Sequence, residues 1–128
     1  MKPLLIRTSF MLASALISFS CNDNAFPDAA YPRMNTLPVT NVSSTGATFH
    51  GSTLQNGTEE IINRGFVWST KQSVTLEDGQ RIDLGPGPEE FDAEVLSGLS
   101  PKTIYYVKAF AITKNYTVYA PYVQFASN

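Results

Sequence analysis

The stretch that decides the fold lies in the last third of the chain: Leu99-Ser100-Pro101-Lys102-Thr103-Ile104-Tyr105-Tyr106-Val107-Lys108-Ala109-Phe110-Ala111. Successive side chains of a β-strand point to opposite faces of a sheet. Every second residue from Tyr105 to Ala111 therefore shares one face, which the pattern predicts to lie in the core. Tyr106, Lys108 and Phe110 share the other face, which is predicted to point outward.

The same period of two continues on both sides of this stretch. From Thr36 onward, short alternating segments are separated by turn residues, and no window shows a sustained helical period. Seven strands are expected, near residues 36–42, 47–52, 61–70, 80–84, 90–96, 105–111 and 118–125. Pro38 lies in the first of them, and proline suits an edge strand because it cannot donate to a sheet ladder. The pattern predicts an all-β antiparallel sandwich or barrel.

Four short motifs resemble the fibronectin type III domain, in particular the version carried by bacterial lipoproteins, and they follow one another along the chain in the order of that domain. Three of them are Ala47, Phe49 and Gly51; Gly65, Phe66, Trp68 and Ser69; and Thr117, Tyr119, Ala120, Val123 and Phe125. The fourth, Leu99-x-Pro101-x-Thr103-x-Tyr105, resembles the tyrosine corner, in which a Tyr hydroxyl bonds back to the nearby backbone. The resemblance covers about residues 36–128 and implies one seven-stranded fibronectin type III or immunoglobulin-like antiparallel β-sandwich.

Six aromatic residues are expected to form the structural core of this sandwich: Phe49, Phe66, Trp68, Tyr105, Tyr119 and Phe125. Gly51 stands where the vertebrate module has a core Trp. Phe66 or Trp68 is expected to fill that volume. Tyr116 stands where the family often has Gly in the last hairpin.

The N-terminus has the pattern of a secretory signal. Lys2 and Arg7 precede residues 8–20, a mostly apolar run of 13 residues without charge. That run is shorter than the roughly 20 residues that a membrane-spanning helix needs, so residues 1–20 are predicted to be a signal peptide. Cys21 follows at once and resembles the lipidated cysteine of a bacterial lipobox. The alternative is a plain secretory signal with an incidental cysteine.

Residues 21–35 are predicted to be a lipidated tether, because they are rich in Asn, Asp, Ala and Pro and have no period. Lipid on Cys21 implies a membrane as the first partner. It also implies an exported protein anchored to the outer membrane, either in the periplasm or on the cell surface.

Composition excludes several classes of function. The formal net charge is −2, from 9 Lys and Arg against 11 Asp and Glu, so nucleic-acid binding is not expected. One cysteine and one histidine cannot supply the three or four ligands of a zinc site. No metal and no cofactor is expected, and an internal disulfide is excluded.

Catalysis is not expected either. His50 is the only imidazole, and the alternation of its strand predicts that it faces solvent. Acidic pairs such as Glu59-Glu60 and Glu89-Glu90 leave a small carboxylate-based hydrolase as the least favoured reading, which would need two carboxylates facing each other across a groove.

Surface recognition is the remaining class. Aromatic side chains can stack on sugar rings or anchor protein contacts, and the predicted surface comprises Tyr106, Phe110, Tyr116 and Tyr122. The loops at 55–60 and 113–116 are the other candidate surface. We expect a non-catalytic, membrane-anchored binding or spacer module that recognises a protein or a carbohydrate. The alternative is a structural subunit of an envelope or surface assembly, with an apolar patch around Tyr106, Phe110 and Tyr122.

Overall fold

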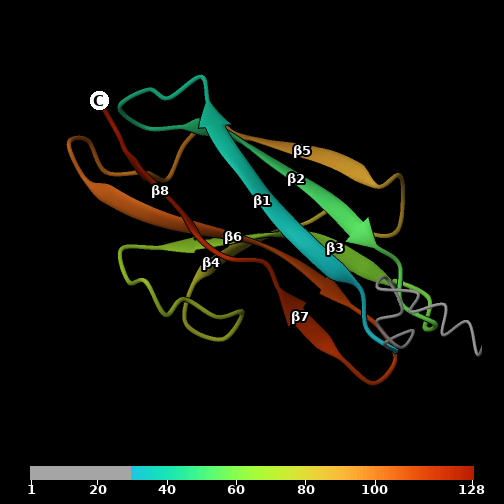
Figure 1. Cartoon of the computed structure of the whole chain (residues 1–128). Helices are drawn as coiled ribbons and strands as arrows, with labels where there is room; N and C mark the ends of the chain where they lie inside the picture. Colours follow the sequence, from blue (N-terminus) through green and yellow to red (C-terminus); the bar gives the residue numbers. More distant parts are fainter. Residues whose placement is uncertain (1–29) are drawn as a thin grey trace, which may run out of the picture.

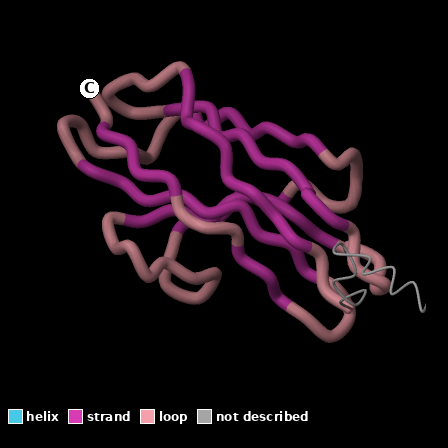
Figure 2. Tube along the Cα trace, in the orientation of Figure 1, coloured by secondary structure: helices cyan, strands magenta, loops and turns pink. Residues whose placement is uncertain are grey.

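Two antiparallel β-sheets pack face to face in the computed structural model, which describes residues 30–128 (Figure 1). The first sheet has the strand order β1 (Arg33–Thr40), β2 (Ala47–Gln55), β5 (Glu90–Val95). The second has the order β4 (Gln80–Asp83), β3 (Asn63–Ser69), β6 (Ile104–Ile112), β7 (Thr117–Tyr119), and β8 (Val123–Ala126) also pairs with β6. Figure 2 shows no helix among the described residues. The predicted all-β antiparallel sandwich is confirmed.

Aromatic side chains from both sheets fill the space between them. Phe49 of β2 lies at the centre, with ring centroids 5.7 Å from Phe66, 5.1 Å from Trp68 and 5.6 Å from Phe125. Tyr105 stacks on Phe125 at 5.6 Å. All five of these side chains are buried, as the alternation predicts.

The volume beside Gly51 is filled by a side chain of the neighbouring strand β5 in the same sheet. A Cβ on Gly51 would lie 2.8 Å from the ring of Phe91, which β5 places directly across from it in the ladder. Phe91 is a core residue that the sequence analysis missed, and its ring centroid lies 5.2 Å from that of Phe66. Glycine is needed at position 51 because the Phe91 ring occupies the place of a side chain.

The tyrosine corner is present. The hydroxyl of Tyr105 accepts a hydrogen bond of 2.7 Å from the backbone N–H of Ser100, five residues upstream. Lys102, in the turn between them, has a φ of 53°, and Gly98 has a φ of 103°. The corner therefore fixes a loop whose backbone uses two left-handed residues, and it holds that loop against the start of β6.

Two strand boundaries differ from the prediction. β1 begins at Arg33, so residues 33–35, which were assigned to the tether, belong to the sheet. They do so because Met34 continues the inward alternation of Thr36, and both side chains are buried. The expected last strand is divided into β7 and β8 around Pro121, which has no N–H to donate. The sandwich therefore has eight strands rather than seven.

The division of the last strand leaves the N–H of Ala109 without a partner in β7 or β8. The hydroxyl of Thr36 fills this place and accepts a bond of 2.9 Å from that N–H across the two sheets. Thr36 is buried, so this bond satisfies a backbone donor that would otherwise be buried without an acceptor.

Phe110 was predicted to point outward as part of a binding surface, and this prediction is wrong. Phe110 is fully buried in a second cluster with Val67 and Val74, on the outer side of the second sheet. The loop of residues 70–79 folds over this side and inserts Val74. Lys108 donates to the carbonyl of Val74 at 3.0 Å, which holds the loop in place.

Tyr119 belongs to this second cluster rather than to the main core. It is half-buried, and its hydroxyl accepts a bond of 3.0 Å from the backbone N–H of Leu76 in the covering loop. Its role is to hold the loop of residues 70–79 from one side, while Lys108 holds the loop from the other.

Candidate functional site

Three loops far apart in the sequence meet at one end of the sandwich, which we call the loop end. They are residues 56–62 between β2 and β3, residues 84–89 between β4 and β5, and residues 113–116 between β6 and β7. β1 also begins at this end, so Ala30 and Tyr31 lie beside the loops (Figure 1). The C-terminus lies at the opposite end.

Side chains and backbone tie the loop end together. Asn115 Nδ2 donates to Glu59 Oε1 at 2.8 Å and joins the first loop to the third. The backbone N–H of Glu59 donates to the carbonyl of Ala30 at 3.1 Å. The rings of Tyr31 and Tyr116 meet edge to face, with centroids 5.5 Å apart, and both remain exposed. The two loops predicted as a candidate surface therefore form one continuous surface.

The loop of residues 84–89 is positioned by Asn63 at the start of β3. Asn63 Oδ1 accepts from the N–H of Gly85 at 3.0 Å, and Asn63 Nδ2 donates to Asp83 at 2.9 Å. Arg81 Nη2 also donates to Asp83, at 2.6 Å. Hydrogen bonds from Arg81 and then Asn63 hold the pKa of Asp83 below its usual range.

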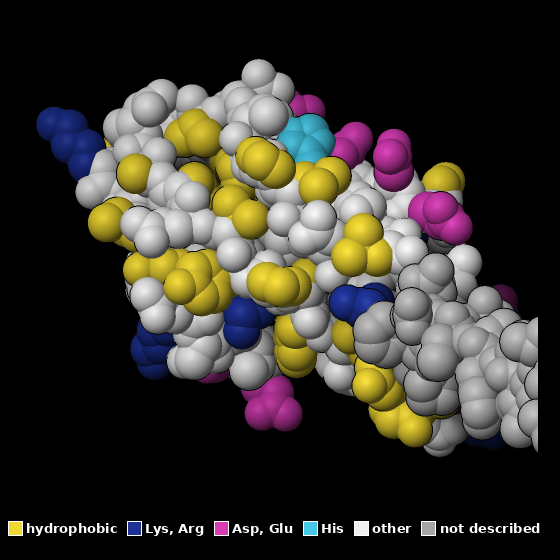
Figure 3. All heavy atoms as spheres, in the orientation of Figure 1, with side chains coloured by type: hydrophobic (Ala, Val, Ile, Leu, Met, Phe, Trp, Pro, Cys, Tyr) yellow, Lys and Arg dark blue, Asp and Glu magenta, His cyan; other side chains and the backbone are white. Residues whose placement is uncertain are grey.

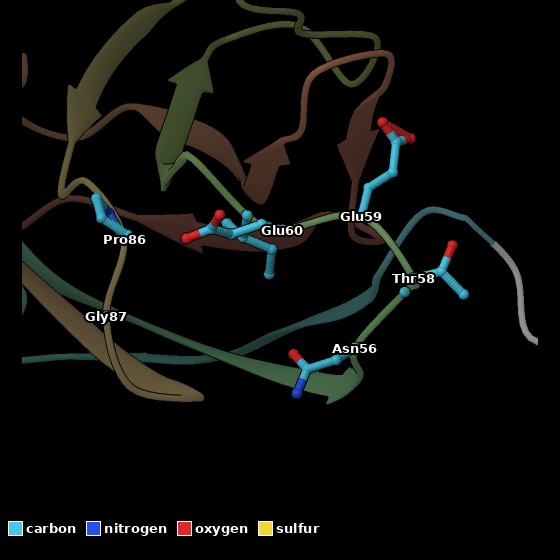
Figure 4. Close-up of a pocket in the computed structure, with 8 residues that line it drawn as sticks. Asn56, Thr58, Glu59, Glu60, Pro86 and Gly87 are labelled. Carbon is cyan, nitrogen blue, oxygen red and sulfur yellow. The ribbon is translucent and has the colours of Figure 1, made fainter.

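An open hollow of about 410 Å³ lies between the first two loops (Figure 4). Its wall carries carboxylate, amide and hydroxyl groups beside the aliphatic side chains of Ile61 and Pro86. The lining residues are Asn56, Gly57, Thr58, Glu59, Glu60, Ile61, Pro86 and Gly87. This open hollow with polar groups on its wall is a candidate site for a small ligand.

The two glutamates of the hollow do not form a hydrolytic pair. In Figure 4, Glu60 points toward Pro86, whereas Glu59 points to the other side. Glu59 is engaged by Asn115. Glycoside hydrolysis needs two carboxylates that face the same bond, and these two face in different directions.

Arg64 does not line this hollow, but it contacts Gly87, which does, and it was not singled out in the sequence. It is buried, and its guanidinium carbon lies 4.5 Å from the centroid of the Phe91 ring. Burial lowers the pKa of Arg64 from its ordinary value. A Cβ on Gly87 would collide with Nη2 of Arg64, so Gly87 lies directly on the guanidinium.

The predicted aromatic surface is split between two places. Tyr106 and Tyr122 meet edge to face on the outer side of the second sheet, with centroids 5.2 Å apart. Tyr116 lies at the loop end with Tyr31, and Phe110 is in the interior. The apolar patch expected for a structural subunit therefore lacks Phe110.

His50 is half-buried on the outer face of the first sheet, with acidic side chains beside it in Figure 3. Its Nδ1 bonds to Asp92 Oδ1 at 2.5 Å, and its Nε2 lies 2.6 Å from the Thr40 hydroxyl. This order of groups is that of a catalytic triad. However, the Asp92 side chain is 66% exposed, so the site does not exclude water as such chemistry requires. The chain of bonds ties β1, β2 and β5 together across the sheet.

Two further findings concern metal sites and membrane-spanning helices in the described residues. Within residues 30–128, no group of three or more His, Cys, Asp and Glu side chains could hold a metal ion. In the same part of the chain, no helix is long and apolar enough to cross a membrane. Cys21, the predicted signal peptide at 1–20 and the part of the predicted tether before residue 30 lie outside the described residues.

Comparison with known proteins identifies the fold. No protein-family model matches the chain. No curated protein matches it either. Among solved structures, the sensor domain of the anti-sigma factor RsgI4 in Pseudobacteroides cellulosolvens is similar, at 14% identity and a TM-score of 0.54 over 75% of this chain and 93% of that one. The solution structure of that sensor domain gives 13% identity and a TM-score of 0.55 over 75% and 74% of the two chains. At this identity the likeness shows the fold alone.

Proposed function

We propose that the protein is an exported bacterial lipoprotein, anchored by a lipid on Cys21, whose sandwich is a non-catalytic recognition module of the fibronectin type III type. The observation that carries the recognition part is the gathering of three loops and two exposed tyrosines at the loop end, where a hollow opens between the first two loops. Sandwich domains commonly bind through loops gathered at one end, because rigid sheets hold the loops in a fixed arrangement.

One feature supports the fibronectin type III assignment, and one supports a binding role. The Leu99-to-Tyr105 motif ends in a hydroxyl that bonds to the Ser100 backbone, as a tyrosine corner does. The similar sensor domain of an anti-sigma factor is consistent with a module that senses or binds rather than catalyses. The ligand class, a protein or a carbohydrate, is part of the proposal.

The proposed anchor gives the module an orientation. Ala30 lies at the loop end, and Cys21 precedes it by nine residues, a distance of at most about 30 Å even for a fully extended chain. A lipid on Cys21 would therefore keep the loop end close to the membrane. The proposed ligand is accordingly a component of the envelope near that membrane, such as a glycan or a membrane protein.

The anchor is tested by fractionating cells that produce the wild type or Cys21→Ser. We expect the wild type in the outer-membrane fraction and the variant in the soluble exported fraction. A Cys21→Ser protein that stays with the membrane like the wild type would show that the protein is not anchored by a lipid on Cys21.

Recognition is tested by a photo-crosslinking amino acid placed at Thr58 in the loop end. The matched control is Ser73, an exposed residue in the loop at the opposite end. In intact cells, we expect a discrete adduct from position 58 and none from position 73. Adducts from position 73 alone would place recognition at the wrong end.

A further inference from the structure

β5 is an outer strand of the first sheet and pairs with β2 on one side only. The backbone N–H of Thr53 donates to the carbonyl of Glu89, which fixes the positions at which this antiparallel ladder exchanges its bonds. By alternation, every second residue from Phe91 onward bonds to β2. The backbone groups of the other three residues point away from β2: Glu90, Asp92 and Glu94. Within residues 30–128, no backbone group bonds to this side of β5, which we call the free edge.

The side chains of the same three residues form an acidic row on the outer face of the sheet. All three are exposed, and Figure 3 shows acidic side chains along β5. Asp92 bonds to His50. Glu90 and Glu94 have no ion pair within residues 30–128. Opposite charges that face each other on neighbouring strands stabilise the pair, and like charges destabilise it. The acidic row therefore favours a basic strand at the free edge.

The second sheet extends one strand beyond the first on this side of the sandwich. β5 contacts β3 across the core, and β4 lies beyond β3 at the outer edge of the second sheet. Ile82 of β4 and Leu84 after it are half-buried and pack against the main core. A strand added to the free edge would therefore lie over β4 and cover these two apolar side chains.

We propose that the free edge binds an extended segment of a partner protein in which basic and apolar residues alternate. In strand addition of this kind, backbone hydrogen bonds give affinity and alternate side chains give specificity. The residues of the added strand that pair with the acidic row face it directly, which selects Lys or Arg. The residues between them point inward over Ile82 and Leu84, which selects apolar side chains. This surface runs along the side of the sandwich, so the proposal goes beyond recognition by the loop end and does not depend on it.

Charge disfavours two other occupants of the free edge. If two copies paired through antiparallel β5 strands, their acidic rows would face each other, and like charges directly opposite destabilise a strand pair. Residues 22–29, which precede the described part of the chain, contain Asp23 and Asp28 and no Lys or Arg. The acidic row repels both of these strands, so the occupant that fits is a basic segment of another protein.

The test compares three peptides for binding to the purified protein by isothermal titration calorimetry. Each is a short peptide in which Lys and Val alternate, and two of them carry N-methyl groups on the backbone nitrogens, either of every Lys or of every Val. An added strand bonds to β5 through the Lys N–H groups, whereas the Val N–H groups point away. We expect the Lys-methylated peptide to bind about tenfold more weakly and the Val-methylated peptide to match the unmodified one. Equal binding of the two methylated peptides, or no binding of the unmodified peptide, overturns the proposal.

Two charge reversals separate pairing with β5 from general attraction between the protein and a basic peptide. Glu94→Lys is expected to weaken binding of the unmodified peptide about fivefold. Glu77→Lys is the matched control, because it makes the same charge change at an exposed residue of the 70–79 loop, and we expect it to leave binding within about twofold. Equal weakening by the two variants would show long-range attraction only and overturn the proposal.

Amide hydrogen exchange, followed by NMR with the unmodified peptide bound, locates the contact. We expect slower exchange at the N–H groups of Asp92 and Glu94, which have no acceptor among residues 30–128. Slowing confined to the second sheet or to the loop end, with these two amides unchanged, would overturn the proposal. The crosslinking test at position 58 decides the role of the loop end separately, so the failure of either proposal leaves the other standing.

Discussion

The tyrosine corner provides the sharpest stability test of the fold. Tyr105→Phe removes one hydroxyl and leaves the ring, which is buried and stacked on Phe125. The lost group accepts the 2.7 Å hydrogen bond from the Ser100 N–H. The variant therefore changes one polar contact and no apolar packing.

The expected loss follows from that contact. Leaving a partly buried donor without its acceptor costs about 1–3 kcal/mol. In a domain of this size, each kcal/mol lowers Tm by roughly 4–8 °C. We therefore expect the Tm of Tyr105→Phe to fall by about 8–16 °C for a loss near the middle of the range, about 2 kcal/mol.

The assay is thermal unfolding followed by circular dichroism, with Tyr106→Phe as the matched control. Tyr106 is the next residue on the same strand, and among the described residues its hydroxyl makes no hydrogen bond. We expect the control to stay within about 0.5 kcal/mol of the wild type. A Tyr105→Phe protein that melts with the wild type would show that the corner does not stabilise the sandwich.

Three further substitutions test other parts of the structure. Phe110→Ala is expected to lower the free energy of unfolding by about 3–5 kcal/mol in chemical denaturation, since the side chain is fully buried. A change below about 0.5 kcal/mol would show that the Phe110 side chain is exposed. Gly51→Ala is expected to cost about 1–3 kcal/mol, because its Cβ would lie 2.8 Å from the Phe91 ring, and an unchanged midpoint would contradict that packing. The lowered pKa of Asp83 adds stability above the unfolded value of about 3.9 that is lost as pH falls through the folded pKa. Asp83→Asn should flatten that acid limb of the stability–pH curve, and an identical limb would refute the assignment.

The alternation of apolar and polar residues along the sequence was sufficient to predict the strands and most of the core. It placed Tyr105 and Phe49 inside because each shares a face with small or apolar neighbours. It failed at Phe110, because burial there comes from Val74 in a loop more than thirty residues earlier in the chain. A local alternation cannot report a loop that folds back over the outer face of a sheet.

The remaining errors in the fold had local signals. Phe91, Ala93 and Val95 alternate with three acidic residues, which marks an inward face. Pro121 stands in the middle of the expected last strand and predicts its interruption.

The candidate site was predicted only in part. The loops at 55–60 and 113–116 were both expected to be exposed, but their contact through Asn115 and Glu59 depends on the stacking of the two sheets. Arg64 was missed although it has the parity of Phe66 and Trp68. That parity was the available signal, since it predicts a charged side chain inside the sandwich.

Recognition through the loop end is tested most directly by hydrogen exchange of the protein in its native envelope compared with the purified protein. We expect slower exchange in the envelope for residues 56–61 and 113–116, with residues 70–79 at the opposite end unchanged. Protection confined to residues 70–79 or to the Tyr106 and Tyr122 face, or no protection at all, would contradict recognition through the loop end.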